Sequence, residues 1–237
     1  MLEPLAFAAW AVRTTPPLPI TNDQLDMFEI DLATETITTE NKNRAAIIEH
    51  PKGLLLAIAD GAGGLASGKE AAELVIQIVK EAAVSETEFF KPLRWCNILS
   101  QADNWLFAHP TAGETTAVIV ALCEGFVCGA SVGNSGAFLV QEQTELELTA
   151  EQWQKPLIGS GIATPISFGP IPFTGTLVLA TDGLIKNAPP EKIRQIVRAN
   201  NAKNATKALI ESVRYPSGNQ PDDVTVIIIH SKITQSG

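Results

Sequence analysis

The sequence predicts an α+β fold in which mostly antiparallel β-sheets carry helices on their outer faces. Two observations lead to this prediction. Strand-like segments come first, two amphipathic helices follow, and then come several consecutive strands, two more helices and one last strand. Strands and helices do not alternate along the whole chain, so a doubly wound parallel sheet is not favoured.

The N-terminal half predicts a strand, a hairpin and two helices. The segment MFEIDLAT (27–34) alternates as a strand does, and the segments 44–50 and 54–59 flank the PKG turn of a hairpin. Residues 67–84 carry apolar side chains at helical spacing, and so do residues 92–107. We therefore expect two amphipathic helices with their apolar faces turned inward.

The C-terminal half predicts further strands and a second pair of helices. Two apolar runs flank Glu124-Gly125, which is a two-residue hairpin signal, and AFLVQ (137–141) adds another strand. The Gly- and Pro-rich stretch 155–175 predicts a loop. The remaining segments are a buried strand, two helices and a last strand, at 176–182, 191–200, 204–214 and 223–231.

Length and composition indicate one globular domain. The chain has 237 residues, of which 45% are hydrophobic and 18% charged. We expect an irregular leader at 1–26, one domain at 27–231 and a short tail at 232–237. The apolar runs are too short for a transmembrane helix, so we expect no membrane partner. A net charge of −9 without a basic cluster argues against nucleic acid as a partner.

The cysteine and histidine patterns argue against a CxxC site and against a histidine-based metal site. Cys96, Cys123 and Cys128 have no CxxC spacing, which predicts buried thiols in a reducing compartment, and we expect a cytoplasmic protein. The three histidines are dispersed along the chain and have no paired spacing. This pattern argues against a histidine-based metal site.

The stretch LLLAIADGAGGLASGKE (54–70) fits two different sites. Gly63, Gly68 and Lys69 match the P-loop pattern GxxxxGK between a strand and a helix. However, Glu70 stands where a Ser or Thr hydroxyl should coordinate magnesium, and its charge would face the phosphates. The alternative is a carboxylate metal site at the end of the strand.

Three aspartates stand at matching strand ends and favour the carboxylate site. Asp60 ends LLLAIA and Asp182 follows TLVLAT, each before a glycine, whereas Asp222 precedes DVTVIII. Asp-Gly at the end of a strand is also ordinary turn chemistry. Hard divalent cations prefer several oxygen ligands, and aspartates that converge from different strands supply them. The sequence therefore predicts a metal site.

Five motifs together resemble a known family. The segments DGAGGLASG, ETTAVIVAL, ASVGNSGAFLV, LVLATDGL and PDDVTVIII, in this order and spacing, resemble the metal-dependent protein phosphatases of type 2C and their bacterial relatives. The resemblance runs over residues 27–231. It implies two packed antiparallel β-sheets flanked by helices on both sides, an α-β-β-α sandwich. It also implies hydrolysis of phosphoserine and phosphothreonine in proteins by a water activated by Mn²⁺ or Mg²⁺.

The resemblance also assigns roles to individual residues. It implies that Asp60 bridges two metal ions and that the main-chain carbonyl of Gly61 binds one of them. Asp182 and Asp222 would complete the carboxylate set of the first ion. Two ions in such a site activate the water between them and neutralise the charge of the phosphoryl oxygens.

The loop before the second strand departs from the family pattern. Lys42-Asn43 stands where the family has a Glu-Asp pair, although Glu40 would supply a carboxylate if the register slipped. The phosphate-binding arginine of the family has no counterpart, and Thr38 is the nearest residue. These changes put the second metal ion in doubt.

Two further departures affect a third, weaker metal site. Asn134 replaces the Asp of the family's GDS turn, and Lys186 replaces the Asp that follows the TDG motif by four positions. The third site is therefore expected to be absent. Lys186 is either a solvated surface residue or a cation that pairs with Asp182 and removes the need for a metal. Two functions stay open: a working phosphatase, and an inactive relative that binds a phosphoprotein or another partner.

Overall fold

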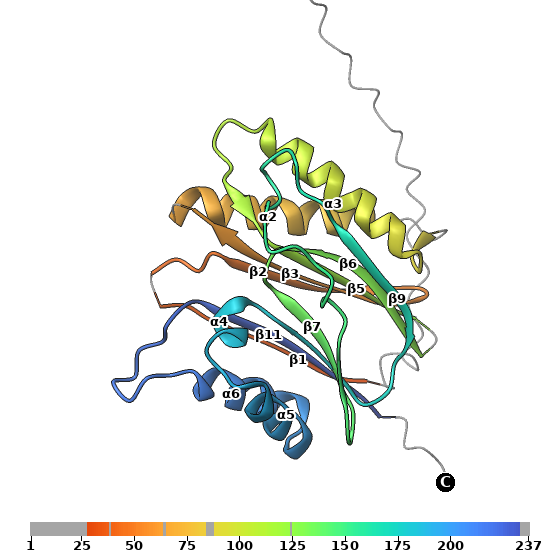
Figure 1. Ribbon diagram of the computed structural model, residues 1–237, viewed down its shortest axis with the longest axis vertical. Helices are drawn as coiled ribbons and strands as arrows, with labels where there is room; N and C mark the ends of the chain where they lie inside the picture. Colours follow the sequence, from red (N-terminus) through yellow and green to blue (C-terminus); the bar gives the residue numbers. More distant parts are fainter. Residues whose placement is uncertain (1–27, 38, 64, 84–87, 124, 233–237) are drawn as a thin grey trace, which may run out of the picture.

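The computed structural model describes residues 28–232 except 38, 64, 84–87 and 124. Two antiparallel sheets lie face to face, and a layer of helices covers the outer face of each (Figure 1). This arrangement confirms the predicted α-β-β-α sandwich. No helix in the described part of the chain is long and apolar enough to span a membrane.

The first sheet has six strands and lies under helices α2 (Leu65–Ala82) and α3 (Pro92–Phe107). The order is β2-β3-β5-β6-β9, and the short β4 pairs with the end of β3. The β2–β3 and β5–β6 pairs are the two hairpins that the sequence predicts. The strands are β2 (Asn43–His50), β3 (Gly53–Ala62), β4 (Glu114–Thr115), β5 (Ala117–Cys123), β6 (Phe126–Val132) and β9 (Ile166–Pro172).

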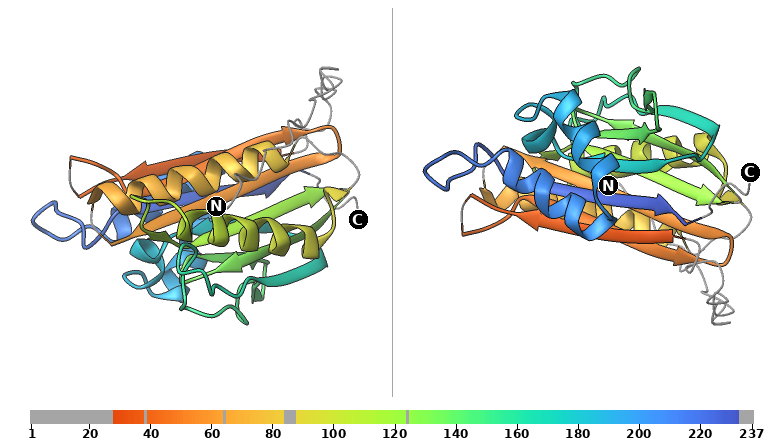
Figure 2. Two further views of the ribbon diagram at one scale, coloured as in Figure 1. Left: turned by 90° about the horizontal axis from the view of Figure 1, so that it is seen from above. Right: turned by 90° about the horizontal axis from the view of Figure 1, so that it is seen from below.

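The second sheet brings distant parts of the chain together. Its order is β1-β11-β10-β7-β8, so the first and last described strands are neighbours. Helices α5 (Pro190–Ala199) and α6 (Ala202–Ser212) cover its outer face (Figure 2). The strands are β1 (Phe28–Glu35), β7 (Gly136–Val140), β8 (Glu145–Glu147), β10 (Thr176–Ala180) and β11 (Val224–Ser231).

The continuous apolar runs of the central strands follow from burial on both faces. In β3, Leu54, Leu56 and Ile58 pack between the two sheets, whereas the residues that alternate with them pack under the helices. A strand between two apolar layers has no solvent face, so it needs no polar residues in alternation. The helices are α2 (Leu65–Ala82), α3 (Pro92–Phe107), α4 (Asp182–Ile185), α5 (Pro190–Ala199) and α6 (Ala202–Ser212).

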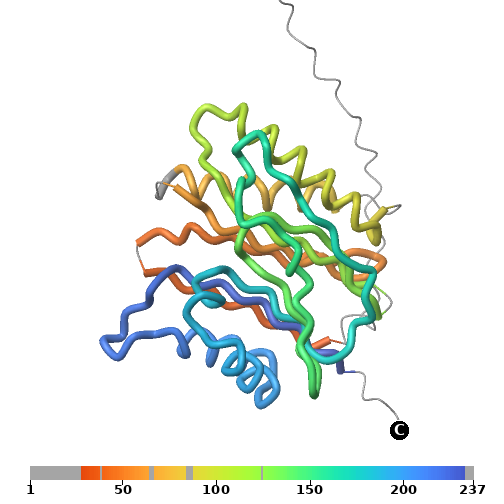
Figure 3. Tube along the Cα trace, in the orientation of Figure 1, coloured from red at the N-terminus to blue at the C-terminus, as the bar shows by residue number. Residues whose placement is uncertain are grey.

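One prediction about the chain path is wrong. The expected loop at 155–175 contains strand β9 (Ile166–Pro172), which pairs with β6 and can be followed in Figure 3. Gly169 and Pro170 lie inside this strand and make it look like a loop. Proline is tolerated there because β9 is an edge strand, where one side needs no ladder hydrogen bonds. Strands β4 and β8 and helix α4 were not predicted either.

Candidate active site

A cavity of about 380 Å³ opens at the end of the sandwich where β3 and β10 end and β11 begins. Asp60, Asp182 and Asp222 all line it. Each comes from a different part of the chain: the end of β3, the start of α4 and the residues before β11. The structure therefore brings together the three carboxylates that the sequence singles out.

The Thr-Thr pair before β5 fixes the main chain of Asp60. The amide of Asp60 donates to Thr116 Oγ1 at 3.1 Å, and its carbonyl accepts from Thr115 Oγ1 and from the Thr116 amide, each at 2.9 Å. Thr116 Oγ1 also lies 2.7 Å from Ser135 Oγ, and both side chains are buried. The ETT and GNS motifs therefore orient Asp60, and buried Ser135 is positioned as a partner of Thr116 and not as a nucleophile.

Glycines let the first turn of α2 approach the end of β3. A Cβ on Gly61 would lie 2.1 Å from the carbonyl oxygen of Gly68, and a Cβ on Gly68 would lie 2.9 Å from that of Ala62. No side chain fits at these distances, so both positions require glycine. Gly61 and Gly68 thus serve the packing of helix on strand.

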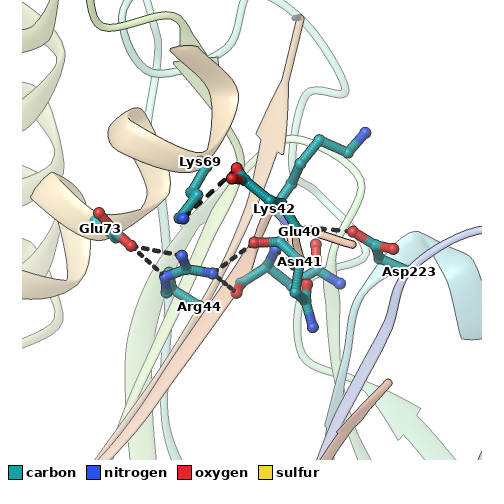
Figure 4. A network of polar contacts seen from close by, with 8 residues as sticks. Glu40, Asn41, Lys42, Arg44, Lys69, Glu73 and Asp223 are labelled. Atoms are coloured by element: carbon teal, nitrogen blue, oxygen red, sulfur yellow. Dashed lines mark hydrogen bonds and ion pairs between the residues drawn. The ribbon is translucent and has the colours of Figure 1, made fainter. Parts of the chain in front are cut away.

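The P-loop alternative finds no support in this geometry. Gly68 and Lys69 lie inside α2, and the strands around them form an antiparallel sheet. The ammonium group of Lys69 pairs with Glu40 at 3.6 Å (Figure 4). Glu40 is accordingly engaged in an ion pair and does not line the cavity, so it does not replace the missing carboxylate.

Asp182 is held by two donors on one of its oxygens. Lys186 Nζ donates to Asp182 Oδ2 at 2.6 Å, and Asn134 Nδ2 donates to the same oxygen at 2.8 Å. The pKa of Lys186 is raised, first because of this hydrogen bond, and also because Asp182, Asp222 and Asp60 are all close enough to attract its charge. The other oxygen, Asp182 Oδ1, is buried and has no hydrogen-bond partner in the described structure.

The carboxylates are close together, and this disfavours the ionised form of Asp60. The pKa of Asp60 is raised from 3.8 to about 8, mainly by burial, then by the charge of Asp182 and a hydrogen bond with it, and by the charge of Asp222. Lys42 acts in the opposite direction. A group of carboxylates in this condition is stabilised by any cation that enters it.

The charge and the oxygen donors of the site suit a hard cation, but the side chains are not already arranged around a cation position. The unpartnered Asp182 Oδ1 and the adjacent Asp60 carboxylate are the oxygen donors that Mg²⁺ and Mn²⁺ prefer. As their side chains lie, no three described His, Cys, Asp or Glu residues form a cluster that could hold an ion. A cation would therefore have to compete with Lys186 for Asp182.

The altered positions lie close to the aspartates. Asn43 pairs with Asp60 across β2 and β3, is buried, and donates from Nδ2 to Thr181 Oγ1 at 3.2 Å. Lys42 lines the cavity. Thr38, the residue nearest to the expected arginine position, lies outside the described residues. The start of β2 thus places the amide of Asn43 beside Asp60, and the loop before it brings the ammonium group of Lys42 to the cavity, where carboxylates were expected.

Asp223 has a role that the sequence analysis missed. Its buried carboxylate accepts hydrogen bonds from Thr36 Oγ1 at 2.8 Å and from the amides of Ile37 and Lys42 at 3.0 Å. It therefore ties the loop between β1 and β2 to the start of β11, beside Asp222. The repeated aspartate in PDDVT is the only signal that could have pointed to it.

We expect Thr116→Val to destabilise the protein by about 1–3 kcal/mol, because the Asp60 amide and the Ser135 hydroxyl would lose a buried partner. Urea unfolding of this variant measures the effect. Thr144→Val is the matched control, since the Thr144 hydroxyl donates to Gln141 Oε1 in an exposed turn and should cost within about 0.5 kcal/mol. Equal stability of the two variants would contradict the proposed support of Asp60 by Thr116.

Comparisons with known proteins agree with this architecture. No protein-family model matches the chain. The chain is 23% identical over 244 aligned positions to "Protein phosphatase PTC7 homolog fig" of Drosophila willistoni, which covers 78% of this chain and 76% of that protein.

Solved structures share the fold at low sequence identity. A bacterial serine phosphatase superposes with a TM-score of 0.75 at 18% identity, over 86% of this chain and 98% of the other. The serine/threonine phosphatase Stp1 from Staphylococcus aureus gives 0.71 at 20% identity, over 86% and 95%. The catalytic domain of the phosphatase PstP, in complex with two manganese ions, gives 0.70 at 17% identity, over 86% and 97%.

Proposed function

We propose that this chain, which has the fold of the type 2C serine/threonine phosphatases, hydrolyses phosphoserine and phosphothreonine in proteins with the aid of a bound Mn²⁺ or Mg²⁺ ion. One observation carries the proposal. Asp60, Asp182 and Asp222 come from three separate elements and line one cavity. Bringing like charges together at buried and half-buried positions is costly unless a cation compensates them, so the arrangement favours a cation-binding site.

The proposed ligands are the carboxylates of Asp60, Asp182 and Asp222 and the carbonyl of Gly61. The ion, when bound, would lower the pKa of a water and neutralise charge on the phosphoryl oxygens. The Thr115 and Thr116 hydroxyls orient Asp60, and Asn134 orients Asp182 through its amide. The two manganese ions of PstP support the choice of metal.

We propose fewer ions for this chain than for PstP. Asn43 and Lys42 stand where the carboxylates of a second ion would be expected, and an ammonium group cannot ligate a cation. Asn134 and Lys186 replace the carboxylates of the third site. One ion at the three aspartates is therefore the proposed state.

A specific contact favours a second candidate function. Lys186 donates to Asp182 at 2.6 Å, and its charge is attracted by all three aspartates. If this ammonium group neutralises the cavity permanently, the chain is an inactive relative that binds a phosphoprotein or another partner. The Lys186 side chain is 62% exposed, so water weakens its hold, and we favour the ion-dependent enzyme.

The deciding experiment is hydrolysis of p-nitrophenyl phosphate and of a phosphothreonine peptide by the whole chain. We expect turnover with Mn²⁺ or Mg²⁺ and none in EDTA. Calorimetric titration with Mn²⁺ runs in parallel and counts the ions bound. Absence of turnover at saturating Mn²⁺ would overturn the enzymatic proposal and leave the binding function.

The proposed substrates are phosphorylated proteins in a reducing compartment such as the cytoplasm. Cys96 and Cys128 are thiols in the structure, and burial raises the pKa of both, which keeps them protonated and unreactive. The overall charge of −9 argues against nucleic acid as the substrate.

A further inference from the structure

Two lysines without a role so far line the same cavity as the aspartates. They are Lys42, just before β2, and Lys155, in the segment between β8 and β9. In the described structure, neither ammonium group has a hydrogen-bond or ion-pair partner. Both side chains are therefore available to a ligand that enters the cavity.

Lys42 differs from the other cations around it. Arg44 is held by Glu73 and by main-chain carbonyls, and Lys69 is held by Glu40 (Figure 4). The Lys42 side chain extends away from both pairs in Figure 4, and no contact is drawn to its nitrogen. Its backbone is nevertheless fixed, because its amide donates to the buried carboxylate of Asp223 at 3.0 Å.

Lys155 is placed by anchors on both sides. Gln152 Nε2 donates to the carbonyl of Ser135 at 2.7 Å, and the Trp153 carbonyl accepts from the amide of Gly133 at 3.0 Å. On the other side, Ile158 and Thr115 exchange two main-chain hydrogen bonds of 2.9 and 3.0 Å. The segment that carries Lys155 is thus tied to the Thr pair and the GNS turn that support Asp60.

A cavity that is lined both by carboxylates and by ammonium groups without a described partner suits a specific kind of ligand. The carboxylates attract a cation, and the ammonium groups attract an anion that lies beside that cation. A phosphoryl dianion meets both requirements, and lysine binds it as a point charge.

We propose that Lys42 and Lys155 bind the phosphoryl oxygens of the ligand and that Lys42 supplies the positive charge that a second metal ion would otherwise provide. The inference rests on the proposed function only for the identity of the anion as a phosphate monoester. The anion subsite itself applies equally to a chain that hydrolyses the phosphoryl group and to one that only binds it.

The test uses the variants Lys42→Met and Lys155→Met and inorganic phosphate as the probe. Calorimetry measures phosphate binding to the whole chain with Mg²⁺ present and again in EDTA. We expect each substitution to weaken binding by about 10-fold, in keeping with the loss of one charge-assisted contact. Lys52→Met is the matched control, because Lys52 is exposed in the turn that follows the opposite end of β2. This variant should bind phosphate as tightly as the native chain does.

A phosphothreonine peptide distinguishes a substrate subsite from a site for free phosphate. Fluorescence anisotropy of the labelled peptide should show the same loss for Lys42→Met and Lys155→Met, and the unphosphorylated peptide should bind weakly to all variants. Phosphate and phosphopeptide binding that equals the Lys52→Met control would overturn the inference even if the enzyme turns over. Lysine-dependent binding without turnover would uphold it and reject only the hydrolytic function.

Discussion

Asp60→Asn is expected to lose metal-dependent phosphatase activity by at least about 10³-fold, which corresponds to about 4 kcal/mol of transition-state stabilisation. Asp60 is the proposed ligand whose pKa is raised by the charges of both other aspartates, Asp182 and Asp222. An asparagine keeps the shape of the side chain but removes the charge that attracts the cation. Steady-state hydrolysis of p-nitrophenyl phosphate at saturating Mn²⁺ measures the loss.

The same variant should change stability in a pH-dependent way. The pKa of Asp60 in the folded protein, about 8, lies above its ordinary value of 3.8, so the folded state binds a proton that the unfolded state has released. Without metal, the free energy of unfolding therefore falls as the pH rises from about 4 to about 8, by at most about 1.4 kcal/mol per pH unit. In Asp60→Asn this slope should disappear, and the variant should be more stable than the native chain at pH 8 in EDTA.

Asp31→Asn is the control for the removal of one carboxylate. Asp31 accepts a hydrogen bond from Thr206 on the outer side of the five-stranded sheet and does not line the cavity, so its loss should leave turnover and the pH slope unchanged. Thermal unfolding between pH 4 and pH 8.5 provides the stability measurement. An Asp60→Asn variant that is active, or that keeps the native slope, would remove Asp60 from the centre of the site.

The layers of the fold could be predicted because a strand that is buried on both faces has a continuous apolar sequence. LLLAIA in β3 and VIVAL in β5 have no polar alternation, which only a strand between two apolar layers tolerates. Edge strands have a less distinctive sequence. The FGPIP segment of β9 contains glycine and proline because one side of the strand makes no ladder bonds, and the sequence alone cannot separate it from a loop.

The candidate site also has residues whose positions the sequence predicts and residues whose positions it does not. Asp60, Asp182 and Asp222 could be predicted to meet, because strand ends and the motif order set their positions. The directions of Lys42, Lys155 and Lys186 could not, because a flexible four-carbon side chain at the surface reaches many positions. The sequence is therefore compatible both with a Lys186 that pairs with Asp182 and with one that faces solvent, and the structure has the pair, at 2.6 Å.

Lys186→Ala is expected to tighten Mn²⁺ binding by about 10- to 100-fold. The ammonium group now pairs with Asp182 Oδ2 and opposes an entering cation. Two such charges at close range near a protein surface interact by up to about 4 kcal/mol before solvent screening. Removing the lysine leaves Asp182 Oδ2 with the neutral amide of Asn134 as its remaining donor, next to the unpartnered Oδ1. Calorimetric titration of the metal-free chain measures the affinity.

Two further variants make this prediction specific to the charge of Lys186. Lys186→Gln keeps a donor of similar reach without the charge and should also bind Mn²⁺ more tightly, whereas Lys80→Ala, on the exposed face of α2, should match the native affinity. If all four proteins bind Mn²⁺ equally, Lys186 does not compete for the site. If only the Lys186 variants bind it, the native lysine has taken the place of the metal, and the chain is the inactive relative whose cavity binds phosphoryl groups without hydrolysing them.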